Sequence, residues 1–275
     1  MFGMAGRRLF GSRLLPSTRP SAGVVVCSPI HGEFPKNYRR EVLMSRVLAR
    51  RGLAVQRFHY GGAGHSDGES AQLSFDTMCE DVGAAADQLR NAAGITRVAL
   101  LGTRVGALAA AATADAETAA IALWEPVVDV GSYVRQAYRA RIVSDLRRGR
   151  SGSASSQSFD EQMRAQGCVD VLGYQIERSL YESLEGHDLS SELRRCTSPV
   201  LLVQFGGSEH LRDEYTKVTE HLASHGVAVT AAVAPLEVSW WLQSELWRRD
   251  AESASQAPLH MTADWVAGIL GRSDA

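Results

Sequence analysis

The pentapeptide Gly102-Thr103-Arg104-Val105-Gly106 stands where an apolar run ends and an alanine-rich run begins. A glycine-bracketed turn of this kind, between a strand and a helix, holds its central side chain at the helix N-terminus. The central residue is Arg104, whose guanidinium stays protonated and cannot attack a carbonyl carbon. Its planar fork binds carboxylates and phosphates instead. The turn therefore predicts a site that binds an anion or polarises a carbonyl, not a nucleophile.

Carboxylates follow two other apolar runs. Glu125 ends "ALWE", and Glu209 follows "PVLLVQFGGS". Because ligands bind at the carboxyl ends of parallel strands, each is a candidate site acid. His210 is a candidate general base, since it is adjacent to Glu209. Cys27, Ser28 and Thr103 are alternative nucleophiles, with packing in the core as the other interpretation. The remaining histidines are alternative bases that are otherwise expected to shape loops, cap or pack: His31, His59, His65 and His260.

Apolar runs that suit buried parallel strands alternate with helical patterns along most of the chain. The predicted strands are residues 23–30, 53–60, 96–102, 119–126, 198–206 and 226–235. The predicted helices are residues 36–52, 74–94, the alanine-rich run that ends at 114, and 259–270. Ser74 is the expected N-cap of the second helix and Gly94 its end. This alternation predicts an α/β fold with a mostly parallel sheet covered on both faces.

Residues 127–197 interrupt the alternation. They are predicted to form a helical insertion. Residues 149–158, which read "GRSGSASSQS", are expected to form a flexible polar loop within it. Residues 1–126 and 198–275 then form the core. An insertion after the fourth predicted strand would lie over the ligand-binding edge of the sheet as a cap or lid.

Composition narrows the class of protein. The 275-residue chain has a net charge of −2, so it lacks the excess of basic residues that would predict binding to nucleic acid or to a membrane surface. Its four cysteines are widely spaced, which predicts unpaired thiols in a reducing compartment, the cytoplasm, and neither a zinc site nor a cofactor. No run approaches the roughly 20 apolar residues that cross a bilayer. The N-terminal segment is predicted to form a short β-hairpin with its turn near residues 16–23.

With these motifs in order, the chain resembles the α/β-hydrolase superfamily, and within it the serine aminopeptidase type. "VVVCSPIHGE" resembles the strand and H-G loop of the oxyanion hole, and "LLGTRVGALAA" the strand, elbow and helix that carry a serine in the family. "QRFHYGGAGHSDG" is similar to the family's R-F-D-Y-x-G-x-G segment, with His59 at the aspartate position. "GTRVGALAA", "LWEPVVDVGSYVRQAYRARI" and "DVLGYQIERSL" are similar to a bacterial subgroup, the exosortase-associated hydrolases, which also carries arginine at the elbow.

The resemblance implies an oxyanion site that has kept its framework. The H-G loop, with His31, Gly32 and Glu33, and the backbone N–H of Val105 at the elbow helix would present donors to an anion or a polarised carbonyl.

The resemblance also places the remaining members of a triad. Glu209 matches the position of the acid. The family's histidine follows the last strand, and "AVAPLEVSWWLQSE" contains none there; Glu237 and Ser239 are nearest. Trp240 and Trp241 are candidates for an aromatic pocket wall, with core packing as the alternative.

Three functions follow from this degenerate triad. The first is acyl transfer without a serine nucleophile, from a thioester to a peptide or small-molecule acceptor in a bacterial biosynthetic pathway. A carrier-protein thioester would fit as the donor. The second is a pseudohydrolase that binds or scaffolds without catalysis. The third is a hydrolase with a displaced triad, which requires two relocations.

A cation at a helix N-terminus is unfavourable unless an anion offsets it. Glu33, Glu125 or Glu209 could pair with Arg104 internally, or a substrate carboxylate or a pantetheine phosphate could bind it. We favour the ligand, because the surrounding pocket framework is preserved.

Overall fold

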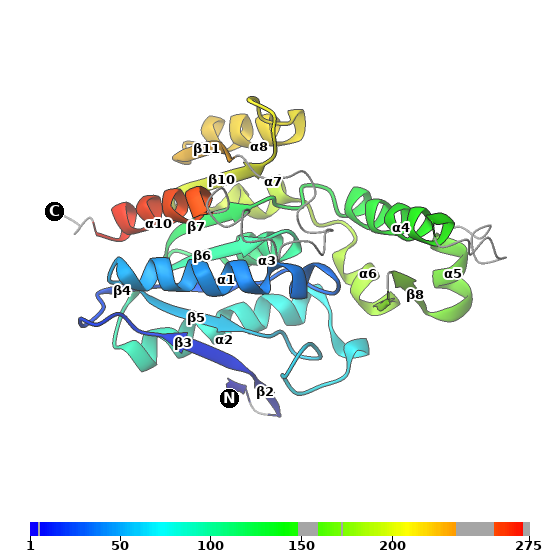
Figure 1. The fold of residues 1–275 in the computed structure, drawn as a ribbon, viewed down its shortest axis with the longest axis horizontal. Coiled ribbons are helices and arrows are strands. Elements are labelled where there is room, and N and C mark those ends of the chain that lie inside the picture. The colour runs from blue at the N-terminus through cyan, green and yellow to red at the C-terminus, as the bar shows by residue number, and fades with distance from the viewer. Residues whose placement is uncertain (5, 148–158, 172, 235–255, 272–275) are drawn as a thin grey trace.

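The structure is a computed structural model in which residues 1–4, 6–147, 159–171, 173–234 and 256–271 are described. A seven-stranded sheet forms its centre (Figure 1). The strands lie in the order β11 (Val229–Ala234), β10 (Val200–Phe205), β7 (Thr118–Trp124), β6 (Arg97–Thr103), β4 (Ala22–Cys27), β5 (Ala54–Phe58) and β3 (Gly11–Leu14). All neighbours are parallel except β3, which is antiparallel to β5. The predicted parallel α/β architecture is confirmed.

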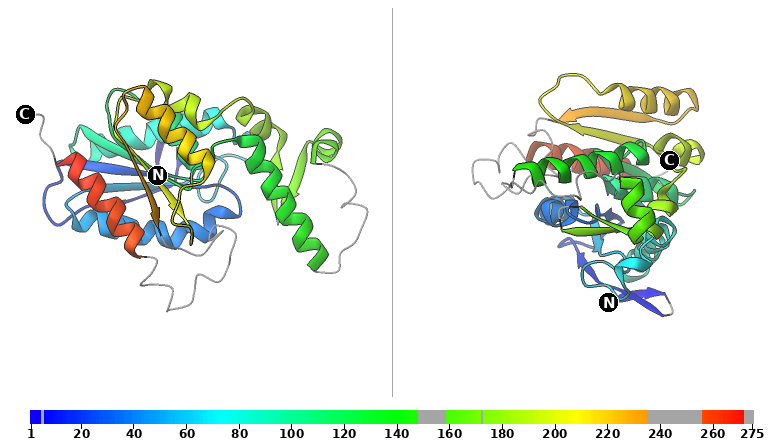
Figure 2. Two further views of the ribbon diagram at one scale, coloured as in Figure 1. Left: turned by 90° about the horizontal axis from the view of Figure 1, so that it is seen from above. Right: turned by 90° about the vertical axis from the view of Figure 1, so that its right-hand side faces the viewer.

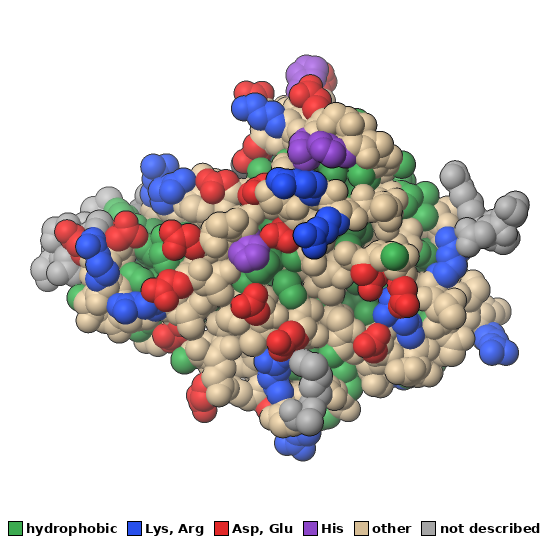
Figure 3. Space-filling model, turned by 180° about the vertical axis from the view of Figure 1, so that it is seen from behind, with side chains coloured by type: hydrophobic (Ala, Val, Ile, Leu, Met, Phe, Trp, Pro, Cys, Tyr) green, Lys and Arg blue, Asp and Glu red, His purple; other side chains and the backbone are tan. Residues whose placement is uncertain are grey.

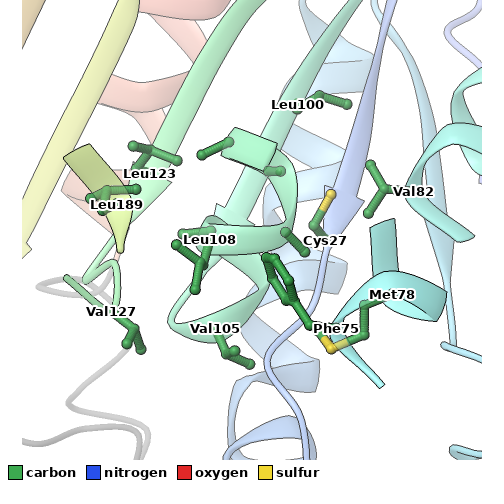
Figure 4. Close-up of a cluster of buried hydrophobic side chains, with 14 of the residues drawn as sticks. Cys27, Phe75, Met78, Val82, Leu100, Val105, Leu108, Leu123, Val127 and Leu189 are labelled. Atoms are coloured by element: carbon green, nitrogen blue, oxygen red, sulfur yellow. The ribbon is translucent and has the colours of Figure 1, made fainter. Parts of the chain in front are cut away.

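Helices cover both faces of the sheet (Figures 1 and 2). On one face, α1 (Glu33–Arg50) and α10 (Gln256–Leu270) enclose one apolar cluster, and on the other α2 (Phe75–Ala93), α3 (Val105–Thr113) and α8 (Asp213–Ser224) enclose the second. Figure 4 shows the second cluster, where side chains of α2 and α3 meet those of the central strands. The parallel strands β4, β5, β6, β7 and β10 are almost wholly buried, which explains why they read as unbroken apolar runs rather than alternating ones, whereas β11 at the edge of the sheet is partly exposed.

The ends of α2 follow the predicted capping chemistry. The hydroxyl of Ser74 accepts a hydrogen bond from the backbone N–H of Thr77 at 3.2 Å. Gly94 has a φ of 63°, the left-handed conformation that ends a helix, and its N–H donates to the carbonyl of Arg90. Both predicted signals are confirmed.

The predicted N-terminal hairpin is wrong. Both edges of β4 are already occupied, by β5 and β6, so the preceding strand β3 cannot fold back on it and pairs with β5 instead. A hairpin does form earlier, between β1 (Phe2–Met4) and β2 (Arg7–Leu9). The α8 helix was also not predicted, although its buried Tyr215, Val218 and Leu222 follow helical spacing.

The segment between β7 and β10 extends away from the sheet beyond the carboxyl ends of its strands (Figure 2). It contains the helices α4 (Val130–Arg147), α5 (Phe159–Gln166), α6 (Arg178–Leu184) and α7 (Leu189–Glu192), and the strands β8 (Cys168–Val171) and β9 (Tyr174–Glu177). The antiparallel β8–β9 pair was not anticipated by a purely helical prediction. The polar loop expected near 149–158 lies outside the described residues. Two short 3₁₀ turns, η1 (Ser70–Gln72) and η3 (Leu193–Arg195), complete the elements.

Acidic and basic side chains are interspersed on the face shown in Figure 3. This mixture agrees with the small net charge of −2. Among the described residues, no helix is long and apolar enough to cross a bilayer.

Candidate active site

Arg104 occupies the tip of a strained turn between β6 and α3. Its φ of 56° and ψ of −124° lie where non-glycine residues are rarely found. The turn is tight because the chain passes close to itself: a Cβ on Gly102 would overlap the backbone of Ala107, and one on Gly106 would overlap the carbonyl oxygens of Cys27 and Ser28. The two glycines therefore permit the elbow geometry, as the sequence predicts.

The Arg104 guanidinium is 6% exposed and has an internal anionic partner, Glu33. Its Nε lies 3.2 Å from Glu33 Oε1, and its Nη1 donates to the backbone carbonyl of Glu125 at 3.2 Å. The guanidinium also lies 5.4 Å from the centre of the Tyr133 ring, a cation–π distance. Tyr133 in turn donates its hydroxyl to Glu33 Oε2 at 3.3 Å. The expectation that a ligand is the partner is thus corrected: the carboxylate of Glu33 stands within reach and offsets the charge.

The H-G loop brings Glu33 to this position. His31 has a φ of 51°, which reverses the chain, and α1 begins immediately afterwards with Glu33 as its first residue. A carboxylate in the first turn of a helix is stabilised by the helix dipole. Burial raises the pKa of Glu33 and outweighs the opposing effect of the Arg104 guanidinium. A carboxyl group with a raised pKa suits proton transfer near neutral pH.

A cavity of about 170 Å³ adjoins the pair, and we call it the first cavity. It lies between the H-G loop, the elbow, α4 and the β8–β9 pair, so the segment between β7 and β10 forms one of its walls. Lys36 lies on its lining, and burial lowers the pKa of this ammonium group while Glu33 opposes the shift. The described residues that line it are Ile30, His31, Gly32, Glu33, Pro35, Lys36, Arg104, Tyr133, Gln136, Ala137, Val171, Tyr174 and Ile176. None of these carries a hydroxymethyl group or a thiol.

Glu125 forms a separate network at the end of β7. It is fully buried and has a φ of 44°. Its Oε1 accepts the backbone N–H of Phe205 at 2.5 Å, and its Oε2 accepts from Arg212 and from the Tyr215 hydroxyl, the latter at 3.2 Å. The carboxylate thus ties β7 to β10 and α8. Its backbone carbonyl accepts a hydrogen bond from Arg104.

The other predicted site residues are not brought to the first cavity. Glu209 and His210 are exposed in the loop after β10, and neither is among the residues that line the cavity. The side chain of Val105 is buried in the α2–α3 core (Figure 4), and the role of its backbone N–H as a donor stays a prediction. Trp240 and Trp241 lie outside the described residues, as do Glu237 and Ser239.

His31 and Gly32 do line the first cavity. Burial lowers the pKa of His31 to about 4, so this imidazole is neutral near pH 7. It shapes the loop and the cavity wall, as the sequence indicates for an H-G histidine.

The alternative nucleophiles are engaged or buried. The Ser28 hydroxyl donates to the buried Glu41 carboxylate at 2.8 Å. Burial raises the pKa of the Cys27 thiol, which disfavours the reactive thiolate. Thr103 is 1% exposed. Among the described residues, no group of three or more His, Cys, Asp or Glu side chains is arranged to hold a metal ion.

Sequence reasoning missed Tyr133, Lys36, Arg212 and Tyr215. Tyr133 and Lys36 lie on helices whose faces toward the cavity are set by tertiary packing. Arg212 and Tyr215 belong to the unpredicted α8 region, and the helical spacing of its apolar residues would have been the available signal.

Comparisons with known proteins show the family of the chain and agree with its fold. The family described as serine aminopeptidase, S33, matches residues 19–172, more than half of the chain. No curated relative matches the chain. Among solved structures, Est1E from Butyrivibrio proteoclasticus with bound ferulic acid has a TM-score of 0.64 and 16% identity, over 97% of this chain and 99% of that one. DcsB in complex with its substrate analogue has a TM-score of 0.66 and 12% identity, over 98% of each chain. A thermostable carboxyl esterase from Bacillus coagulans, in complex with glycerol, has a TM-score of 0.65 and 13% identity, over 95% of this chain and 94% of that one.

Proposed function

The chain belongs to the serine aminopeptidase S33 family and has an α/β-hydrolase fold, and from this premise we propose that it transfers an acyl group directly from a thioester to an acceptor. One observation carries the proposal: Arg104 replaces the elbow nucleophile and is paired with Glu33 beside a cavity. An activated thioester needs no covalent enzyme intermediate if its carbonyl is polarised and an acceptor is held beside it.

Arg104 supplies the positive charge. When an acceptor attacks a thioester, negative charge develops on the carbonyl oxygen. The Arg104 side chain is 7% exposed, so it acts in a site from which most water is excluded and where charges interact more strongly than in bulk solvent. The N-terminus of α3 adds partial positive charge at the same place.

Glu33 is the general base in this scheme. Its carboxylate takes the proton from the acceptor hydroxyl, amine or thiol as the acceptor bonds to the carbonyl carbon. The carbon–sulfur bond then breaks, and the departing thiolate recovers the proton from Glu33. The products are the acylated acceptor and a thiol, so atoms and charge balance.

The size of the first cavity limits what it holds. A cavity of about 170 Å³ accommodates an acyl group but not an entire carrier prosthetic arm. We therefore place the acyl group inside and the pantetheine portion, free or on an acyl-carrier protein, outside. A peptide or small molecule in a bacterial biosynthetic pathway is the acceptor class.

The test uses acyl-pantetheine thioesters with a panel of hydroxyl, amine and thiol acceptors, and thiol release as the readout. Release should depend on acceptor, and Glu33→Gln should lower it by about 10²–10³-fold. Glu182→Gln is the matched control, because Glu182 is exposed on α6. Glu209→Gln tests whether Glu209, in the exposed loop after β10, is the catalytic acid instead. Loss of activity in Glu209→Gln with retention in Glu33→Gln would overturn the assignment and restore a displaced triad.

The second candidate is a pseudohydrolase that binds ligands or partners without catalysis. It is favoured by the internal contacts of Arg104, which include Glu33, the backbone carbonyl of Glu125 and the Tyr133 ring and hold the guanidinium in place. Saturable ligand binding, with no acceptor-dependent thiol release across the whole panel, would support this candidate over acyl transfer.

A further inference from the structure

A second cavity of about 340 Å³ adjoins the first. It lies between the H-G loop, the loop that follows β5, and the turn joining β8 to β9. The two cavities share three lining residues, Ile30, His31 and Tyr174. The two cavities therefore lie next to each other on these side chains, and the scheme for Arg104 and Glu33 does not use the larger one.

The second cavity differs from the first in charge. The first is lined by Glu33, Lys36 and Arg104. Among the described residues that line the second, none is Asp, Glu, Lys or Arg. Its walls are aromatic, aliphatic and glycine residues with a few neutral polar groups, and the aromatic members are Phe34, Phe58, Tyr60 and Tyr174.

Both histidines of the second cavity are also neutral near pH 7. Burial lowers the pKa of His31 to about 4. Burial, followed by the neighbouring His65 and Arg57, lowers the pKa of His59 to about 4. A charged ligand group would have no counter-charge on this lining and would lose its hydration on entering.

The wall around His59 is held in place by several contacts. His59 Nδ1 accepts the backbone N–H of His65 at 3.0 Å, so its proton is assigned to Nε2. The His59 ring packs edge-on against Phe34, with 5.0 Å between ring centres. Gly64 has a φ of 59°, and a Cβ there would overlap the His59 ring. The absence of a side chain at Gly64 thus lets the loop close on the imidazole and fixes the shape of the cavity.

We infer that the second cavity binds the uncharged, aromatic-sized part of the acyl acceptor. This inference rests on the proposed function, since it divides two substrates between two adjoining cavities. The charged cavity holds the reacting carbonyl, where Arg104 and Glu33 act. The uncharged cavity holds the body of the acceptor, whose hydroxyl or amine reaches Glu33 past Ile30 and His31. A volume of about 340 Å³ lies within the range of small-molecule sites, and flat rings suit its aromatic walls.

The binding test uses 2-naphthol as a neutral probe, with the intact chain and its intrinsic fluorescence or calorimetry as the readout. Ala63→Phe places a ring on the wall of the second cavity and should weaken binding at least tenfold. Ala92→Phe is the matched control, because Ala92 is exposed on α2. Phe34→Ala removes an aromatic side chain from the wall, whereas Ala63→Phe fills part of the cavity. It should also weaken binding, so the test does not depend on the folding of one variant.

Kinetic measurements of acyl transfer distinguish a failure of this inference from a failure of the proposed function. With a neutral aromatic alcohol as acceptor, Ala63→Phe should raise the acceptor KM and leave the thioester KM unchanged. If no variant or wild-type protein transfers acyl groups but 2-naphthol binding is still lost in Ala63→Phe, the cavity assignment stands and the proposed function fails. If transfer occurs and both the acceptor KM and the 2-naphthol Kd are unchanged in Ala63→Phe and Phe34→Ala, the inference is overturned.

Discussion

Two arginine–glutamate pairs lie at the carboxyl ends of neighbouring strands, and they are built differently. Arg104–Glu33 joins the end of β6 to the start of α1. Arg212–Glu125 joins α8 to the end of β7. Both carboxylates are buried, and residues with positive φ occur in both places, namely Arg104 and Glu125 themselves.

The difference lies in what surrounds each carboxylate. Glu125 accepts from a backbone N–H, a guanidinium and a hydroxyl, and Arg212, its cationic partner, is 40% exposed at the side chain. Glu33 accepts from Arg104 and Tyr133 and lines a cavity, and its partner Arg104 is 7% exposed at the side chain. The first arrangement fastens secondary structure. The second leaves an ion pair on the lining of a cavity, and for this reason we propose a functional role for it.

The largest expected effect is on stability. Arg104→Ala leaves the buried Glu33 carboxylate without its guanidinium, so near pH 8 the free energy of unfolding should fall by roughly 3–5 kcal/mol. The loss should shrink near pH 5, where the carboxyl group can take a proton. Denaturant unfolding measures both, and the double variant Glu33→Gln/Arg104→Ala should recover part of the loss.

Arg135→Ala is the control for that prediction, because Arg135 is exposed and pairs with the exposed Asp129. Surface pairs contribute little to stability. An Arg104→Ala loss no larger than that of Arg135→Ala would mean that the internal pair is weak and that a ligand is the true partner of Arg104.

Glu125→Gln should have a smaller effect, a loss of about 1–3 kcal/mol, because a neutral amide can still accept the Phe205 N–H but pairs poorly with Arg212. Acyl transfer per folded molecule should change little. A large fall in kcat with retained stability would move the catalytic acid to the end of β7 and reverse the comparison between the two pairs.

The pH dependence of stability tests whether burial, which raises the pKa of Glu33, outweighs the Arg104 charge, which lowers it. Burial raises its folded-state pKa above the ordinary value of 4.5, so the folded protein holds this proton more tightly than the unfolded chain. The stability of the wild type relative to Glu33→Gln should therefore be highest below that value and decline as pH rises through the raised pKa. An increase with pH over the same range would show that the Arg104 charge outweighs burial and lowers the pKa.

The smallest effect is expected at Lys36. This half-buried ammonium group lies on the first cavity and should contribute only modestly to binding a carboxylate there. With benzoate as a simple carboxylate probe, Lys36→Gln should weaken binding by a few-fold, the equivalent of about 0.2–1 kcal/mol. Methyl benzoate, which carries no charge, is the control and should bind both forms equally. Equal benzoate binding by both forms would remove Lys36 from the site.

Local patterns predicted the core and the elbow, whereas they left contacts between distant residues open: Glu33 was one of three candidate internal partners of Arg104, and a ligand was favoured over all three. The unbroken apolar runs, the Ser74 cap and the glycines around Arg104 act over a few residues, so the sequence carries them directly. The Glu33–Arg104 pair spans 71 positions and depends on the chain reversal at His31. Tyr133 joins it from the segment after β7, whose placement is set by packing. The strand order likewise decides the partner of β3, which no local pattern specifies.

Intact-protein mass spectrometry during turnover tests the central claim, direct transfer without an acyl-enzyme. The protein is mixed with excess acyl-pantetheine thioester and an acceptor on which it is active, quenched within a single turnover and weighed. A fluorophosphonate-treated sample is weighed in parallel. We predict that the product accumulates while the protein keeps its unmodified mass in both samples, because the tip of the turn between β6 and α3 carries Arg104, whose guanidinium cannot attack a carbonyl. A stoichiometric acyl or phosphonyl adduct on a serine, threonine or cysteine would contradict this account.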